Sequence, residues 1–515
     1  MKFKLQTFAV VVFILTLANV LYAKESTADS VKYEFKPLVV TGQRYEVPQK
    51  EVAASISIVP PKTIRRTNFT NVADAVSFLT PGVFTTRRST MGYGVAAMAG
   101  GSITIRGIGG KPNSQVLILI DGRPDIQGIF SHPLNDAYLM DNVDHIEILR
   151  GPASAVYGTN SLGGVINIIT KKLPKKGYVT EANAHYGSYN TQKYSVRHSG
   201  VIGKLKYMGL VGYNSSDGHR DNNRFEGQNY ALKLGYRMNP HFNLTFYGNV
   251  TPYEFNDPGP EGIDLYGYFD FGDITRSSMD LTLSNDFGNT SGTLKLHGNF
   301  GEHTLSDGWY SEDQTNGIIA FQNFDLNWDI KTTVGFDVKR FGGTADTNSV
   351  KIGTFFNDEV AGYFHIQKTF FKDVILATGL RLEDNSNFGK EWIPKVGLVY
   401  NIFTNTALRA SASKGFRTPS VKDLFLFPPA NADLQPERLW NYEFGVNQMI
   451  GNVASLDITG FYYEGDQLIE TVMIAPGQMQ NQNIGSNAAR GFEATLKANP
   501  FRNLATSISY SYLDS

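Results

Sequence analysis

No group of residues in this sequence has the types and spacing of a catalytic centre. The nine histidines are scattered, without an HExxH pattern or a paired spacing, so a catalytic zinc site is not expected. The stretch Gly107–Pro112 superficially looks like a phosphate-binding loop, but Ile105 replaces its first glycine and Pro112 replaces its Ser or Thr. No Asp or Glu pair is singled out as a general acid and base. We therefore predict that the protein is not an enzyme and holds no metal ion and no cofactor.

The composition narrows the class of protein further. There is no cysteine, which excludes disulfides, metal-thiolate sites, cysteine nucleophiles and a lipid anchor on cysteine. Charged residues make up only 18%, aromatic residues reach 12%, and there are 51 glycines among the 515 residues. This balance is not that of a helical soluble enzyme. A net charge of -1 gives no reason to expect a nucleic-acid partner.

The N-terminus has the pattern of a secretory signal peptide. Two lysines in Met1–Lys4 precede an unbroken apolar run, Phe8–Ala18, and the small residue Ala23 follows. This run of about 11 residues is too short for a spanning helix, which needs roughly 20. The alternative is a buried N-terminal helix. We predict a signal peptide over residues 1–23, exported and removed, and a polar leader over residues 24–43.

The next region, residues 44–172, is predicted to be a compact mixed α/β domain. Its apolar segments alternate with glycine-rich loops, and the run Val116–Ile120 is so apolar that both of its faces need cover. The turn Asp121–Gly122 follows that run. The predicted elements are a strand at Ser55–Val59, a helix at Asn71–Leu79, and strands at Ser102–Ile105, Val116–Ile120, His145–Leu149 and Val165–Thr170.

From residue 173 to residue 515 the pattern changes to segments of about 10 residues in which apolar and polar positions alternate. Tyr230–Tyr236 and Leu456–Tyr462 are examples. Short polar turns alternate with long loops such as Thr251–Asp273. One face towards lipid and one towards a polar lumen would produce this pattern, as in a transmembrane β-barrel. A soluble, secreted β-rich protein is the alternative.

The number of segments is odd. We count about 17, whereas single-chain bacterial barrels have an even number of strands and an open edge in lipid leaves backbone groups unpaired. The sequence ends in Ser509–Ser515, which reads as a strand entering a loop. We therefore expect a barrel of the 22-stranded, plugged type that is C-terminally truncated and lacks about five strands.

Several ordered motifs resemble the TonB-dependent outer-membrane receptor family along almost the whole chain. The N-terminal region contains Pro37–Gly42 (PLVVTG), Ser102–Gly107 (SITIRG), Val116–Pro124 (VLILIDGRP), Ile146–Pro152 (IEILRGP), Ala155–Gly158 (AVYG) and Gly163–Thr170 (GGVINIIT). The later region contains Lys414–Ser420 (KGFRTPS), Asn431–Glu437 (NADLQPE), Asn441–Gly445 (NYEFG) and Gly491–Glu493 (GFE). Each motif is weak alone, but their number and order are specific.

The resemblance implies a transmembrane antiparallel β-barrel with the N-terminal mixed α/β domain as a plug inside its lumen. It also implies a location in the outer membrane, with lipid around the barrel, and import driven by TonB, the energy transducer of the inner membrane. The TonB box would be Pro37, Leu38, Val39, Val40, Thr41 and Gly42. This β-prone stretch could pair with a partner strand; the alternative is an ordinary first strand of the plug.

By the same resemblance, four charged residues would lock the plug to the barrel wall: Arg106, Arg150, Glu443 and Glu493. The alternative is four separately solvated charges. Two plug loops would face the extracellular side and offer candidate ligand contacts: Arg87, Arg88, Tyr93, Phe130 and His132. Arginine suits an anionic metal chelate, and aromatic rings suit its planar parts.

These features favour a monomeric receptor for the energised import of a ferric siderophore. A cobalamin receptor of the same family is the alternative substrate class. A passive porin, constricted by its N-terminal segment, is the alternative mechanism.

Overall fold

The fold was obtained as a computed structural model. The structure describes residues 39–40, 44, 47–87, 89, 91–94, 101–110, 113–259, 270–426, 429–451, 453–501 and 504–515. The predicted signal peptide lies outside these residues. Within them, no helix has the length and the apolar character that a membrane span requires.

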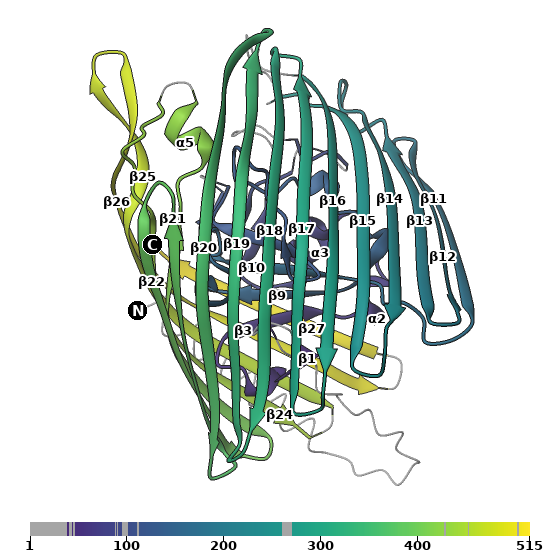
Figure 1. The fold of residues 1–515 in the computed structure, drawn as a ribbon, viewed down its shortest axis with the longest axis vertical. Coiled ribbons are helices and arrows are strands. Elements are labelled where there is room, and N and C mark those ends of the chain that lie inside the picture. The colour runs from purple at the N-terminus through teal and green to yellow at the C-terminus, as the bar shows by residue number, and fades with distance from the viewer. Residues whose placement is uncertain are drawn as a thin grey trace, which may run out of the picture.

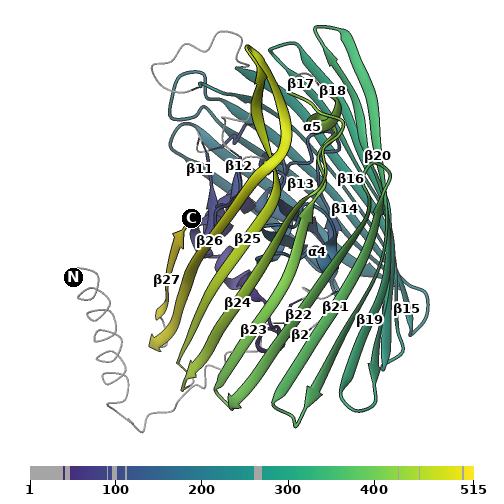
Figure 2. The same cartoon turned by 90° about the vertical axis from the view of Figure 1, so that its left-hand side faces the viewer.

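A curved antiparallel sheet of 17 strands forms the wall of the molecule (Figures 1 and 2). Every strand pairs with the next along the chain, from β11 to β27. The strands are β11 (Tyr178–Gly187), β12 (Thr191–Ile202), β13 (Leu205–Ser216), β14 (Phe225–Arg237), β15 (Phe242–Asn256), β16 (Phe271–Asp286), β17 (Thr290–Leu305), β18 (Trp309–Leu326), β19 (Ile330–Thr347), β20 (Val350–Phe370), β21 (Val374–Asn385), β22 (Gly389–Phe403), β23 (Thr406–Arg417), β24 (Glu437–Ile450), β25 (Ala454–Ala475), β26 (Gln478–Phe501) and β27 (Leu504–Asp514).

Side chains alternate between the two faces of this wall. On β20, His365 is buried at 4% exposure, whereas its neighbours Phe364 and Ile366 are 41% and 36% exposed. This alternation follows from the period of two in a strand, and it confirms the predicted barrel-type sheet. The number of strands in the sheet equals the number of segments in the sequence pattern. A closed barrel of 22 strands stays a prediction.

The two ends of the wall differ in their connections. At one end the turns are short, as at residues 203–204 and 404–405. At the other end some connections are much longer, as at residues 217–224, and one of them contains the short helix α5 (Val421–Phe425). We call these the short-turn end and the long-loop end.

The N-terminal region folds as the predicted α/β domain, with a five-stranded sheet in the order β3-β9-β10-β7-β8 and a three-stranded sheet in the order β4-β5-β6. Its strands are β3 (Ser55–Val59), β4 (Val83–Thr85), β5 (Ile103–Ile105), β6 (Ile108–Gly109), β7 (Val116–Ile120), β8 (Arg123–Pro124), β9 (Val143–Arg150) and β10 (Gly164–Thr170). Its helices are α2 (Pro61–Ile64), α3 (Val72–Leu79) and α4 (Ser154–Tyr157), with 3-10 turns at Gln49–Glu51, Asn135–Ala137 and Met140–Asn142.

The local structure of this domain follows the sequence closely. All five residues of β7 are buried, as expected for an apolar run that is covered on both faces. The predicted turn Asp121–Gly122 has positive φ angles of 48° and 77°, which Asp and Gly tolerate best in a tight connection between strands. Asn71 caps α3 by accepting a hydrogen bond from the backbone N–H of Ala73 at 2.8 Å. Leu79 at the end of α3 is 38% exposed, so the buried face of this helix ends before it.

The domain lies inside the curve of the wall (Figure 2). Its largest core cluster joins plug residues such as Ile118 and Ile166 to Met208, Leu210 and Tyr247 of the wall. Plug and wall therefore bury apolar surface against each other. A short strand pair, β1 (Val39–Val40) with β2 (Val47–Pro48), precedes the plug.

Candidate functional site

Two arginines of the plug meet two carboxylates of the wall. Arg106 donates from Nε to Oε1 of Glu493 at 3.1 Å and from Nη2 to Oε2 of Glu493 at 2.9 Å. Its Nη1 donates to Oε1 of Glu443 at 2.6 Å, and Arg150 donates from Nη1 to Oε2 of Glu493 at 2.6 Å. The structure thus brings together all four residues that the sequence predicted as a lock.

The cluster is closed to solvent. The four side chains are each at most 4% exposed. Burial lowers the pKa of Arg106, but Glu443 and Glu493 outweigh that effect and raise it above the ordinary arginine value. Burial lowers the pKa of Arg150. Two positive and two negative charges meet here, so the buried cluster is neutral only while plug and wall are in contact.

Further residues contact this cluster, and sequence reasoning did not assign them to it; three of them are Ser55, Gly82 and Gly151. The hydroxyl of Ser55 donates to Oε2 of Glu443 at 2.7 Å. A Cβ atom at Gly82 would lie 2.1 Å from Oε1 of Glu493, and one at Gly151 would lie 2.8 Å from Oε1 of Glu443. Both glycines have positive φ angles. In the sequence, Gly82 lies just after the predicted helix Asn71–Leu79 and Gly151 directly follows Arg150, and neither position indicates a contact with the wall.

The first candidate ligand loop is held by carboxylates of the plug. Arg87, whose side chain is 44% exposed, forms an ion pair of 2.9 Å with Asp74. Tyr93 is buried, and its hydroxyl donates to Asp74 at 2.7 Å while its backbone N–H donates to Asp136. Burial and the charge of Asp74 raise the pKa of Tyr93 far above its usual value. Arg88 lies outside the described residues.

The second candidate ligand loop carries Phe130 and His132, which are half-buried. Their rings are 5.6 Å apart, and Phe130 also contacts Trp309 of β18 edge to face at 5.5 Å. Burial lowers the pKa of His132 to about 4, so this ring is neutral at pH 7. The loop is tied to the wall because the backbone N–H of Gly128 donates to Asp313 at 2.7 Å.

At the N-terminal side, Val39 and Val40 of the predicted TonB box pair with β2, and the other four box residues, Pro37, Leu38, Thr41 and Gly42, lie outside the described residues. Arg44 follows the box. Its guanidinium donates to the carbonyl of Gly122 at 3.1 Å, lies 4.7 Å from the centre of the Tyr157 ring, and is 3.9 Å from Asp337 of the wall.

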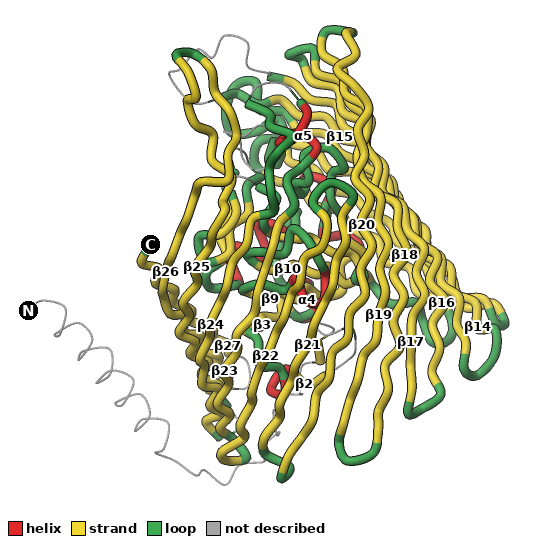
Figure 3. Tube along the Cα trace, turned by 60° about the vertical axis from the view of Figure 1, so that its left-hand side comes forward, coloured by secondary structure: helices red, strands yellow, loops and turns green. Residues whose placement is uncertain are grey.

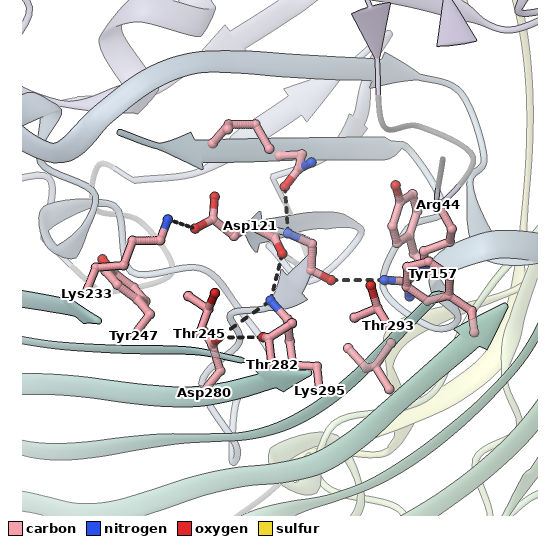
Figure 4. Close-up of a pocket in the computed structure, with 15 residues that line it drawn as sticks. Arg44, Asp121, Tyr157, Lys233, Thr245, Tyr247, Asp280, Thr282, Thr293 and Lys295 are labelled. Carbon is pink, nitrogen blue, oxygen red and sulfur yellow. Dashed lines mark hydrogen bonds and ion pairs between the residues drawn. The ribbon is translucent and has the colours of Figure 1, made fainter. Parts of the chain in front are cut away.

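Next to Arg44, a cavity of about 370 Å³ separates the plug from strands β14 to β18 (Figure 4). Asp121 at the end of β7 stands at its edge, where Nζ of Lys233 is 3.0 Å from its Oδ2 and Thr170 donates to it from both its backbone N–H and its hydroxyl. Burial raises the pKa of Asp121, but Lys233 and Lys295 outweigh that effect and lower it to about 2. Asp121 is therefore an anion that joins two plug strands to the wall.

The described residues contain no cluster of three or more His, Cys, Asp or Glu side chains arranged to hold a metal ion.

Comparison with known proteins gives the family. The family model of the TonB-dependent receptor-like β-barrel matches residues 174–515, and the model of the TonB-dependent receptor plug domain matches residues 48–165. The chain belongs to the TonB-dependent receptor family. The receptor therefore resides in the outer membrane, and it is not an enzyme. The predicted boundaries at residues 23, 43 and 172 stay predictions.

Individual relatives agree with this assignment. The receptor is 25% identical to a vitamin B12 transporter of Photobacterium profundum, over 97% of the chain and 81% of that protein. It is 27% identical to a vitamin B12 transporter of Vibrio vulnificus, over 90% of the chain and 75% of that protein.

Among solved structures, the siderophore receptor PirA of Acinetobacter baumannii has a TM-score of 0.75 at 17% identity, covering 90% of this chain and 81% of that one. The ferripyoverdine receptor of Pseudomonas aeruginosa has a TM-score of 0.76 at 16% identity, covering 95% and 74%. At these identities the likeness concerns the fold.

Proposed function

We propose that the receptor imports a ferric siderophore across the outer membrane with energy delivered by TonB. The observation that carries this proposal is the plug, which lies inside the wall and is joined to it by the buried charges of Arg106, Arg150, Glu443 and Glu493. A ligand cannot pass while these contacts hold. Import then requires work on the plug from the periplasmic side.

The segment Pro37–Gly42 is the proposed site of that work. Its described residues, Val39 and Val40, pair with only two residues of β2. So short a pairing is weak by itself, and a strand of TonB could replace it or extend it through backbone hydrogen bonds. A line of such bonds is suited to transmitting a pull.

The four charges of the lock fit a reversible latch. An intact buried ion pair can add little net stability, whereas removing one partner costs about 3–5 kcal/mol because the other charge stays buried. The lock therefore keeps the plug in one position without requiring a large gain in stability.

The candidate ligand contacts stay Arg87, Arg88, Tyr93, Phe130 and His132. Among the candidate contacts that the structure describes, Arg87 is a cation with a half-exposed side chain, which suits an anionic chelate. Phe130 and His132 present rings for planar groups. Tyr93 could contact a ligand only after its bond to Asp74 breaks.

Cobalamin is the second candidate substrate. The vitamin B12 transporters at 25% and 27% identity favour it, since the matches extend over 97% and 90% of the chain. Both substrates are metal chelates, and both would be imported by the same device. The outward apolar residues of the wall, such as Phe364 and Val360, suit contact with lipid around a monomer.

A growth and uptake experiment tests the proposal. Cells that depend on this receptor are given ferric enterobactin, ferripyoverdine or cyanocobalamin as the single source of iron or cobalamin, and uptake of the labelled compound is measured. We expect uptake of a ferric siderophore. If only cyanocobalamin is taken up, cobalamin replaces the ferric siderophore as the proposed substrate. Uptake of none of the three compounds contradicts the proposal.

The variant Val40→Pro tests the energy step. Proline has no backbone N–H to donate to a partner strand, so we expect it to abolish uptake while ligand binding and membrane insertion stay unchanged. Val40→Ala keeps the donor and serves as the matched control. A passive porin would be indifferent to both substitutions.

A further inference from the structure

The wall contains a seam between β22 and β23. Pairing between these strands covers residues 395–400 and 403 of β22, whereas β22 pairs with β21 from Gly389 to Tyr400. On its other side, β23 pairs with β24 from Thr406 to Arg417. Pairing across the seam ends at Lys395 and Ser413, next to Pro394. A proline has no N–H for the next rung of a ladder, which gives a local reason for the two strands to part.

Where β22 no longer pairs with β23, plug residues contact the C-terminal end of β23 and the residue that follows it. The backbone N–H of Phe416 donates to the hydroxyl of Ser154 at 3.2 Å, and the backbone N–H of Thr418 donates to the hydroxyl of Thr159 at 2.8 Å. Figure 3 shows α4 directly inside the wall at this point, and α4 contacts β21, β22 and β23.

Apolar packing fills the same seam. The side chain of Ala155 in α4 packs between Ile393 of β22 and Phe416 of β23, and all three residues are buried. Glu391 of β22 forms an ion pair of 2.9 Å with Arg438 of β24 and a shorter one with Lys414 of β23. Plug residues therefore contribute to the closure of the wall.

The chain beyond this point leads directly into the long loop that carries α5. The hydroxyl of Thr159 also lies 3.0 Å from that of Thr418, and the Thr418 hydroxyl has a second, longer contact of 3.4 Å with Glu359 of the wall. Three residues later α5 begins, and the backbone N–H of Lys422 donates to the carbonyl of Ile129 in the plug at 3.0 Å.

Side chains of the same segment pack on the plug. Val421 and Leu426 form a buried cluster with Ile129, and Phe130 and Phe425 pack against this cluster. The α5 segment thus covers the plug loop that carries two of the proposed ligand contacts, Phe130 and His132.

We propose that Ser154 and Thr159 are positioning residues that hold the α5 segment, residues 418–426, inward over the plug. Their hydroxyls accept backbone hydrogen bonds from Phe416 and Thr418, at the end of β23 where β22 no longer pairs with it. A movement of the plug then frees the end of β23 and releases α5 from the ligand side. The consequence for ligand binding rests on the proposed function, but the positioning itself does not.

Hydrogen exchange on the purified full chain tests this inference without any ligand or TonB. Thr159→Val removes the acceptor hydroxyl at nearly constant volume. We expect the Thr418 amide to exchange faster, and also the amides of Lys422 and Leu424, by about three- to tenfold, the range that corresponds to one lost hydrogen bond. Thr159→Ser restores the hydroxyl and should restore the protection.

Thr344→Val is the matched control, because Thr344 also shares a hydroxyl contact, 2.9 Å from Thr354, but within the wall. It should leave residues 416–424 unchanged. If Thr159→Val fails to fold, as loss of protection throughout β21 to β24 would show, Ser154→Ala removes the other acceptor and is measured in the same way.

A change at Thr418 without any change at Lys422 would overturn the inference, because Thr159 would then hold one amide and not the segment. An unchanged Thr418 amide would overturn it as well. Failure of the proposed function has a different signature, since it appears as absent uptake or as an indifferent Val40→Pro variant in cells.

Discussion

Arg106 in the plug and Glu493 in β26 are joined by two parallel hydrogen bonds, 3.1 Å from Nε to Oε1 and 2.9 Å from Nη2 to Oε2, across 387 positions of sequence. Arg150 shares the same carboxylate. A planar guanidinium that meets a carboxylate in this way fixes both distance and orientation. One side chain of the wall thus positions both the turn after β5 and the end of β9 in the plug.

Loss of Glu493 should loosen the plug more than loss of any exposed charge. Glu493→Gln leaves the buried cations Arg106 and Arg150 short of one negative charge, so we expect plug docking to lose about 3–5 kcal/mol. The measurement is urea-induced loss of amide protection in β9 and β10. Asp358→Asn is the control, because Asp358 and Arg340 are more than half exposed and such a pair contributes at most about 1 kcal/mol. Equal effects of the two substitutions would show that the cluster is not a lock.

Arg44 should hold the start of the plug in place. Arg44→Met removes the bond to the Gly122 carbonyl and the contact with the Tyr157 ring, which together are expected to contribute about 1–2 kcal/mol. We expect faster amide exchange in residues 47–51. Lys50→Met removes an exposed cation of the same segment and should change nothing there. Unchanged exchange in the Arg44 variant would mean that β2 is held by its apolar contacts alone.

Gly128 should tolerate no side chain. A Cβ atom there would lie 2.4 Å from the carbonyl oxygen of Gly342 and 2.7 Å from that of Gln314, both in the backbone of the wall. We expect Gly128→Ala to break the bond to Asp313 and to destabilise the docked loop by about 1–3 kcal/mol. Amide exchange at residues 127–132 measures this destabilisation. Gly362→Ala is the control, because nothing lies within 4 Å of its Cβ position. Full protection in the Gly128 variant would rule out the close approach.

His132 should make the same loop sensitive to acid. Burial lowers its pKa to about 4 from the ordinary value of 6.5, so the folded state binds fewer protons than the unfolded state between these values. The stability from the neutral ring is therefore complete above about pH 6.5 and is lost as pH falls towards 4. Arg276 and His303 lower the pKa of His132 further, whereas Asp313 raises it.

The emission of Trp309, which contacts Phe130, reports this titration when the other three tryptophans are replaced by phenylalanine. We expect a transition near pH 4 that disappears in His132→Gln. A midpoint near 6.5 would mean that the ring is solvated.

Much of the fold could be predicted because its signals are local. The apolar run Val116–Ile120 and the turn Asp121–Gly122 were placed at the residues where the structure has them. Alternation along each segment of the wall reflects only which neighbour faces inward, so it identified strands without knowledge of their partners. The helix over Asn71–Leu79 was also found from the spacing of its apolar residues, although Leu79 is exposed.

The candidate site could be predicted from the sequence only in part. Arg106, Arg150, Glu443 and Glu493 were grouped through motifs that resemble a family, and the structure brings their side chains together. Tyr93 was chosen as an exposed loop aromatic, yet its hydroxyl turns inward to Asp74, 19 positions away. No sequence pattern near Tyr93 indicates that contact.

The sequence by itself determined the elements, because the period of two in a strand, the cap of a helix and the residues of a tight turn act over a few neighbours. Only the tertiary structure decided which elements meet: Gly128 with Asp313 across 185 positions, and Thr159 with Thr418 across 259. Such contacts form where a folded plug matches the shape and hydrogen-bonding groups of a curved wall. That match depends on the packing of both parts together and leaves no local signal in either one.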